Sequence, residues 1–292
     1  MELLANINWF PGHMAQTRRM IREDLKSVDI VFELLDARIP ESSRNPEIGS
    51  ILGEKKRVVI LNKEDLADPD LTKRWKEAFQ REGLGAVPLD CKSGKGLRQI
   101  LSESRRLLAD KIQKDREKGM TKPIRAMVVG IPNVGKSTLI NCLAGAKKAK
   151  TEDRAGVTRQ KQWVKAGKEL ELLDTPGVLW PKFEDAETGV RLAVTGAIRD
   201  AVLPVEEVAC ALCGLLRDLA PEMLVRRYKL TLDDLSPDPY DIFLAIGKKR
   251  GMLIRNGEID CERCAAMILD EFRSGKIGRI TLEAPGEYGL SD

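Results

Sequence analysis

Gly130-Ile131-Pro132-Asn133-Val134-Gly135-Lys136-Ser137 is the stretch that decides the fold. It matches G-x-x-x-x-G-K-[ST], the P-loop, whose glycines let backbone N–H groups turn toward phosphate oxygens. The apolar run 124–129 before it predicts a buried strand, and the apolar spacing after it predicts a helix over 137–143. Strand, loop and helix in this order place the positive helix end on the phosphates. The alternative is a glycine turn that matches the motif by chance, but such a turn would not need a strand before it and a helix after it.

The P-loop supplies most of the predicted nucleotide contacts. We expect Lys136 to reach the β- and γ-phosphates and Ser137 to ligate Mg²⁺. The other predicted nucleotide contacts of this stretch and of the residue after it are Asn133, Val134, Gly135 and Thr138. A P-loop alone does not choose between ATP and GTP.

The choice of base comes from Asn62-Lys63-Glu64-Asp65, which follows a predicted strand at 58–61. The Asp65 carboxylate is suited to accept hydrogen bonds from guanine N1–H and the N2 amine, while Asn62 supports the loop and the Lys63 stem covers the base. Adenine has an acceptor at N1 and no 2-amino group, so it would leave Asp65 buried and unpaired. Taken alone the motif also fits a polar turn; beside a P-loop it indicates guanine.

Two further stretches fit a GTP switch. Asp174 ends a predicted strand at 170–173 and would hold Mg²⁺ through water, and the N–H of Gly177 would sense the γ-phosphate. Thr158 lies in a polar, basic stretch and is the candidate switch threonine, which ligates Mg²⁺ when GTP is bound. At position 178, where many GTPases carry a water-orienting glutamine, the chain has valine, so we expect slow intrinsic hydrolysis.

A weaker match follows the predicted strand at 86–89. Cys91 and Lys92 stand where a Ser-Ala-Lys base loop would lie, with Cys91 in the alanine position. We expect only that this loop contacts the base.

The order of the motifs is informative, because the guanine loop (residues 62–65) and the base loop (residues 91–92) precede the P-loop (residues 130–137). This order predicts an α/β fold of circularly permuted P-loop GTPase type, with a six-stranded, mostly parallel sheet flanked by helices. After about residue 185 the spacing of apolar residues predicts helices and no strands. We therefore expect a GTPase domain over 1–184 and a smaller all-helical domain over 185–292.

On these residues the chain resembles the ribosome biogenesis GTPase A family (YlqF/RbgA type). The permuted order, Trp9–Met14, Asp36-Ala37-Arg38-Ile39-Pro40 and a tail ending near 280–285 all look like that family. The resemblance implies GTP hydrolysis in late maturation of the large ribosomal subunit, with rRNA and ribosomal proteins as partners and the helical domain as an RNA contact. It also implies that Asn133 is a candidate potassium ligand; the alternative is a turn-forming asparagine.

His13, the only histidine, is the candidate that replaces the missing glutamine. Imidazole exchanges protons with water near neutral pH, and Pro11-Gly12 forms a turn that can aim it. The family resemblance implies that this segment lies near the nucleotide. A structural histidine is the alternative.

Composition limits the remaining possibilities. No apolar run approaches a membrane span and no signal peptide is present, so we expect a cytoplasmic monomer with free thiols. Residues 185–292 carry 14 Lys and Arg against 19 Asp and Glu, whereas the rest carries 35 against 26. An anionic partner is thus expected to contact the first two-thirds of the chain. Local basic clusters at 226–229 and 248–250 could also contact phosphates; the alternative is a solvated helix face.

The pairs Cys210/Cys213 and Cys261/Cys264 fit a zinc site or, by their helical spacing, small core residues.

Two other functions compete with a GTP-driven assembly factor. One is a GTPase that serves tRNA modification or vesicle traffic, which the permuted order and the N-terminal stretch disfavour. The other is a GTP-binding regulatory scaffold with little turnover, which Val178 permits.

Overall fold

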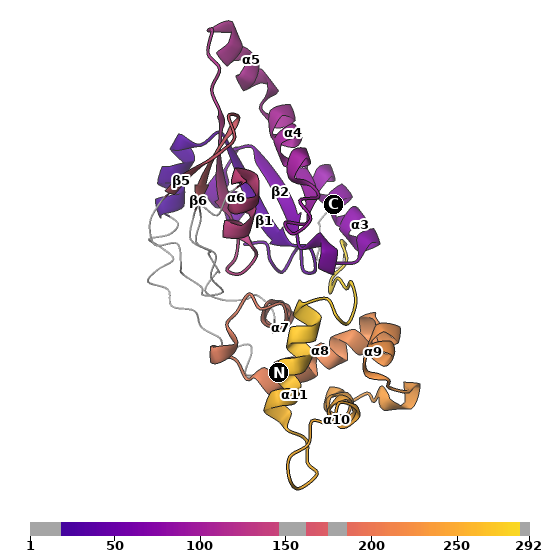
Figure 1. Ribbon diagram of the computed structural model, residues 1–292. Coiled ribbons are helices and arrows are strands. Elements are labelled where there is room, and N and C mark those ends of the chain that lie inside the picture. Colours follow the sequence, from indigo (N-terminus) through magenta and orange to yellow (C-terminus); the bar gives the residue numbers. More distant parts are fainter. Residues whose placement is uncertain (1–18, 146–161, 175–185, 287–292) are drawn as a thin grey trace. The chain divides into compact units, whose positions relative to one another are not determined.

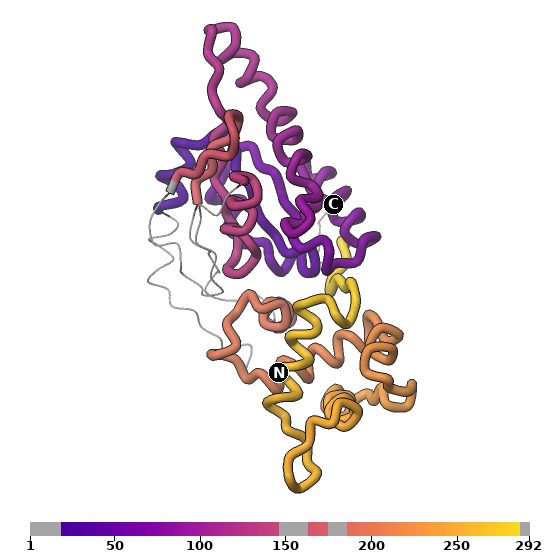
Figure 2. Tube along the Cα trace, in the orientation of Figure 1, coloured from indigo at the N-terminus to yellow at the C-terminus, as the bar shows by residue number. Residues whose placement is uncertain are grey.

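The computed structural model describes residues 19–145, 162–174 and 186–286 (Figures 1 and 2). These residues divide into a unit that contains the sheet, 19–174 with 283–286, and a helical unit, 186–282. The sequence-based boundary at 184/185 differs from this division chiefly in residues 283–286, which pack with the sheet although they follow the helical region.

The sheet has six strands in the order β3-β2-β1-β4-β6-β5. All neighbours are parallel except β5 and β6, which form an antiparallel hairpin at one edge. The predicted fold class is confirmed. The sequence also predicts strands over 29–35 and 162–166, and each predicted strand agrees with an observed one to within a residue at each end. The observed strands are β1 (Ile30–Asp36), β2 (Arg57–Asn62), β3 (Gly85–Leu89), β4 (Ile124–Val129), β5 (Gln162–Ala166) and β6 (Leu170–Asp174).

The strand order brings distant motifs to one edge of the sheet. From β1 the chain builds toward β2 and β3, and only later adds β4 on the other side. The carboxyl ends of β1, β2, β4 and β6 therefore lie together, although they are far apart in the chain. In open parallel sheets such a reversal of strand order is where ligands bind.

Helices cover both faces, which is why all seven residues of β1 are buried. On one face α3 packs Trp75 and Phe79 against Val59 and Leu61 of β2. The helices of this unit are α2 (Ile48–Leu52), α3 (Pro69–Arg81), α4 (Leu97–Leu107), α5 (Ala109–Glu117) and α6 (Lys136–Ala144), after a helical turn at 19–24. The sequence predicts helices over 71–81, 97–108 and 137–143, which correspond to α3, α4 and α6. It does not predict α2, and it predicts only a helix end and linker over 105–125, where α5 lies.

The helical unit contains α7 (Ala186–Val194), α8 (Val205–Leu219), α9 (Pro221–Tyr228), α10 (Pro239–Lys249) and α11 (Cys261–Arg273). Leu212, Cys213, Phe243 and Cys264 are fully buried there, so the two central thiols occupy core positions. The six cysteines are free. Among the described residues, no three His, Cys, Asp or Glu side chains form a group that could hold a metal ion.

Two of the arginines expected to face phosphates are used inside the helical unit. Arg227 Nε donates to Glu271 over 2.9 Å, and Arg250 lies 3.5 Å from the same carboxylate with its guanidinium over the Tyr228 ring. None of the helices in the described ranges is both long and apolar enough to cross a membrane.

Candidate nucleotide-binding site

The P-loop joins β4 to α6 with backbone that only glycine fits. A Cβ on Gly130 would lie 2.5 Å from Leu34 O, and one on Gly135 would lie 2.5 Å from Asn62 Nδ2. Gly135 also has a φ of 102°, which disfavours any side chain. Both glycines thus let the loop pass close to the neighbouring strands.

Lys136, the first residue of α6, is held inside this loop. Its Nζ donates to Ile131 O over 2.7 Å and to Gly130 O over 3.2 Å, and the residue is buried. Burial lowers the pKa of Lys136 to about 8, although the carboxylate of Asp174 opposes the shift. A buried ammonium group held by two main-chain carbonyls can offset the negative charge of bound phosphates.

Asp174 and Ser137 provide the oxygen donors that Mg²⁺ prefers. Asp174 is buried at the end of β6, opposite Val128 of the P-loop strand, and Ser137 is half-buried in the first turn of α6. A carboxylate and a hydroxyl at this edge fit the divalent ion that P-loop GTPases generally use. The ion would screen the charge of the phosphates.

The guanine loop meets the P-loop directly. Asn62 Nδ2 donates to Val134 O over 2.7 Å, a hydrogen bond between residues 72 apart in the chain. The oxygen of the same amide is buried and forms no hydrogen bond within the described part of the protein. The sequence predicted both motifs; the fold brings them into contact.

Asp65 and the base loop also come together. Lys92 Nζ donates to Asp65 Oδ2 over 3.1 Å, and both side chains are partly accessible. Cys142, on α6, donates to Cys91 O over 3.2 Å. Burial and the neighbouring Cys142 thiol raise the pKa of Cys91 to about 12, so this thiol stays protonated and acts as a packing group.

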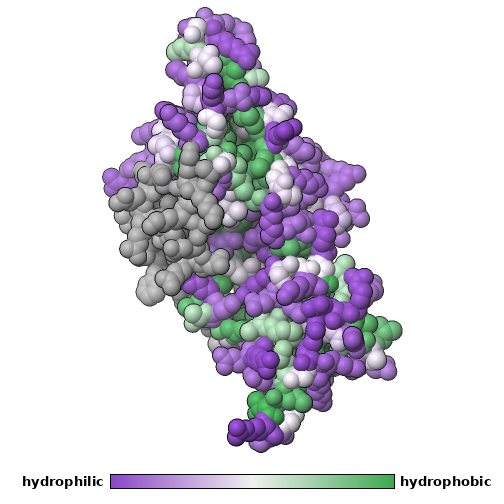
Figure 3. Space-filling model, in the orientation of Figure 1, coloured by the Kyte–Doolittle hydropathy of each residue, from purple (hydrophilic) through white to green (hydrophobic). Residues whose placement is uncertain are grey.

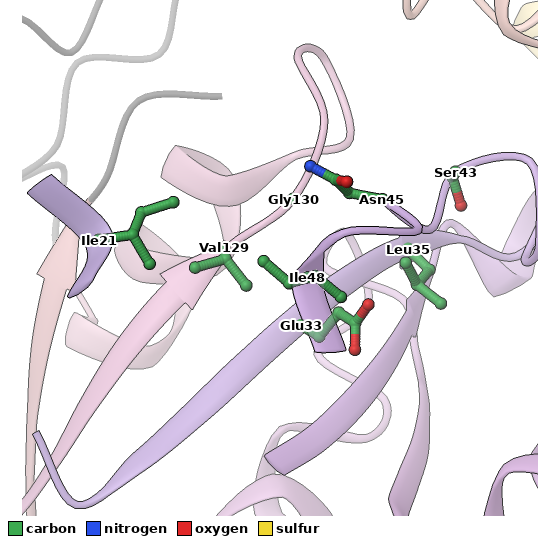
Figure 4. A pocket seen from close by; sticks show the side chains of 8 residues that line it. All are labelled: Ile21, Glu33, Leu35, Ser43, Asn45, Ile48, Val129 and Gly130. Atoms are coloured by element: carbon green, nitrogen blue, oxygen red, sulfur yellow. The ribbon is translucent and has the colours of Figure 1, made fainter. Parts of the chain in front are cut away.

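Beside the P-loop lies a small pocket, which the sequence did not predict (Figure 4). It measures about 20 Å³, enough for one water molecule, and Gly130 and Val129 form one of its sides. Buried Glu33 also lines it and pairs with Arg57 over 3.0 Å. Burial raises the pKa of Glu33 despite Arg57 and Arg44. The space is far too small for a nucleotide.

Three predicted residues, His13, Thr158 and Gly177, lie outside the described residues, as does Val178. Thr138 is exposed on α6 and Asn133 has a left-handed φ of 57° in the loop. The sequence missed Asp36 as a partner of the guanine loop. Its carboxylate accepts from Lys63 Nζ over 3.0 Å. The signals in the sequence were its place at the end of a strand and the family-like stretch 36–40, and neither names its partner.

A P-loop, a guanine loop hydrogen-bonded to it, and an aspartate ending the adjacent strand define the class: a P-loop GTPase with circularly permuted motifs. A family model described as 50S ribosome-binding GTPase matches residues 125–227. The curated protein "Ribosome biogenesis GTPase A" of Priestia megaterium is 52% identical and covers 96% of this chain and 98% of its own. Its namesake in Thermotoga maritima is 30% identical over 96% and 95%.

The solved structures agree. GNP-bound YlqF from T. maritima has a TM-score of 0.64 at 26% identity and covers 93% of this chain and 99% of its own. The GDP-bound structure of YlqF has a TM-score of 0.65 at 27% identity, with coverages of 92% and 100%. The chain belongs to the ribosome biogenesis GTPase A family, and the predicted recognition is confirmed. It is a GTPase.

The lowered pKa of Lys136 predicts that nucleotide binding takes up a proton in mildly alkaline solution. Above about pH 8 the free protein loses the Lys136 proton, and the phosphates of GDP would raise the pKa and restore it. At about pH 8.5 we expect uptake of about half a proton or more per GDP. Calorimetry in buffers of different ionisation enthalpy measures this number.

Lys136→Arg is the control, since its guanidinium stays charged and should show no uptake at this pH. Binding heats of the unsubstituted protein that do not depend on the buffer would contradict the prediction.

Proposed function

We propose that the protein is a GTP-hydrolysing assembly factor for the large ribosomal subunit, acting late in maturation, with its GTP state coupled to subunit and rRNA binding. The observation that carries the nucleotide part is the hydrogen bond from Asn62 to Val134, because it joins the base-reading and phosphate-binding motifs in one site. Family membership and the printed description of the matching family support the ribosomal part. GTP turnover with and without large subunits tests the whole proposal.

Asp65 is the proposed guanine-reading residue, with Asn62, Lys63, Cys91 and Lys92 around it. Asp65→Asn replaces an acceptor with an amide that can donate to the 2-oxo group of xanthine. We expect loss of GTP binding and gain of XTP binding, measured by fluorescent nucleotide titration.

Lys92→Ala is the matched control, because it removes the partner of Asp65 but not the carboxylate. It should still prefer GTP over XTP. Unchanged GTP affinity in Asp65→Asn would show that Asp65 does not contact the base.

A basic cleft beside α5 supports rRNA as a partner. In Figures 1 and 2, α5 extends beyond the sheet, and the cleft beside it has a volume of about 530 Å³. Its exposed Arg116, Lys122 and Lys168 form no ion pair within the described residues, whereas Arg105 and Lys111 are paired with carboxylates. This part of the surface mixes hydrophobic and hydrophilic residues (Figure 3). Cations of this kind can neutralise nucleic-acid phosphates and so release the counterions that are condensed on the phosphates.

The helical unit contributes fewer such groups. Arg227 and Arg250 are held by Glu271, which leaves four exposed cations in the two clusters: Arg226, Lys229, Lys248 and Lys249. We propose that this unit meets rRNA through these few side chains and otherwise through its shape, given its acidic balance.

Replacing Arg116, Lys122 and Lys168 together with alanine should weaken co-sedimentation with large subunits. Each lost phosphate contact lowers the slope of log affinity against log salt by about one. The control triple, Lys73, Arg74 and Lys76 to alanine, removes the same charge from α3. An equal loss in both triples would attribute the effect to net charge and reject the cleft.

The proposed ions and catalytic groups follow from the same edge of the sheet. Ser137, Asp174 (through water) and Thr158 would hold Mg²⁺, and Asn133 is the proposed ligand of a potassium ion that would offset phosphate charge. The N–H of Gly177 would sense the γ-phosphate. We propose a cytoplasmic monomer.

His13 is the proposed group that orients water in place of the residue at 178. His13→Ala should leave GTP and GDP affinity near that of the unsubstituted protein, because water and not nucleotide is the partner. Subunit-stimulated kcat should fall about 10- to 100-fold. Stimulated turnover that is unchanged in this variant would make His13 a structural residue.

A further inference from the structure

Glu283 is buried in the unit that contains the sheet, although it follows the helical unit in the chain. Its side chain is 2% exposed. The carboxylate accepts hydrogen bonds from the backbone N–H groups of Glu41 and Ser42, and from Ser42 Oγ over 2.7 Å. Its main-chain oxygen accepts from Trp75 Nε1 over 3.0 Å. A charged acceptor held by backbone donors is a strong and directional anchor.

The loop anchored in this way is tied to the end of β1. Ser43, the next residue, is 1% exposed and accepts from the backbone N–H of Asp36 over 3.0 Å. Its own N–H donates to Ile39 O, and that of Ile39 to Asp36 O, both over 2.9 Å. The segment from Asp36 to Ser43 is thus closed on itself, and Glu283 fixes its far end.

Asp36 in turn contacts the guanine loop. Its carboxylate accepts from Lys63 Nζ over 3.0 Å and from both Nε and Nη2 of Arg38. Burial alone would raise the pKa of Asp36, but Arg38 and Lys63 outweigh it and hold the pKa below its usual range. The backbone N–H of Ala37 also donates to Asn62 O over 2.8 Å.

Lys63 needs such support because its backbone is strained. With φ of 60° and ψ of 36° it is left-handed, a conformation that costs a residue with a side chain free energy. It lies between Asn62, which contacts the P-loop, and Asp65, the proposed guanine reader. The conformation at position 63 therefore decides where the Asp65 carboxylate points.

We propose that Glu283 is a positioning residue for guanine recognition, acting through the Ser42–Ser43 loop and Asp36 on Asn62 and Lys63. The inference rests on the proposed base-reading role of Asp65. Guanine selection then depends on a carboxylate more than 200 residues further along the chain.

The test compares GDP with IDP, whose base lacks the 2-amino group that Asp65 would bind. Glu283→Ala should lower the ratio of IDP to GDP dissociation constants about three- to tenfold, because the Asp65 carboxylate loses its alignment. Glu283→Gln, which keeps the size of the side chain, should give a smaller loss. Asp36→Asn should resemble Glu283→Ala, and the double variant should show no further fall, as expected of residues in one network.

Trp75→Phe separates positioning from stability. It removes the hydrogen bond to the Glu283 main chain but leaves the carboxylate on Ser42, so it should lower Tm and preserve the IDP to GDP ratio. A Glu283→Ala protein with lowered Tm and an unchanged ratio would make Glu283 merely structural and overturn the proposal. Additive losses in the double variant would do the same. If Asp65→Asn keeps its GTP affinity, the base-reading role itself fails, a result distinct from either.

Discussion

The close approach of Asn62 to the P-loop is the constraint on which the site depends. A side chain at position 135 would occupy the place of the Asn62 amide, which is 2.5 Å from where its Cβ would lie. Glycine at 135 therefore serves two purposes, since it permits the backbone conformation of the loop and leaves room for Asn62, which connects the guanine loop to the P-loop. The strand order allows this contact, because only one strand, β1, lies between β2 and β4.

Much of the sheet and of the nucleotide motifs could be predicted from sequence, because their signals are local. The apolar run 124–129 matches β4 to the residue, and the P-loop and guanine loop were identified by residue spacing alone. Helix α5 was missed because none of its residues is buried, so it carries no apolar periodicity. Helix α2, with five residues, is too short for a periodic signal.

The contacts that the sequence did not reveal are long-range. Glu283 and Glu41 are separated by 242 positions, and neither residue belongs to a motif with a known spacing. From the sequence, the basic clusters at 226–229 and 248–250 could contact phosphates or form a solvated helix face, yet two of their arginines contact Glu271 in the fold. A charge in a sequence does not disclose its partner, because the pairing depends on which helix faces pack together.

The strand order also affects how the protein forms during synthesis. Strands β1, β2 and β3 are neighbours in both chain and sheet, so the half that carries the guanine loop can assemble as soon as its residues have emerged. The P-loop strand β4 then pairs with the free edge of β1, and the hairpin of β5 and β6 extends the sheet outward from it. Until β4 arrives, that edge of β1 presents unpaired backbone groups, which is the period of greatest risk for wrong association. In a GTPase with unpermuted motifs the P-loop strand is made first. In this chain it joins a sheet in which the strands next to the guanine loop already exist.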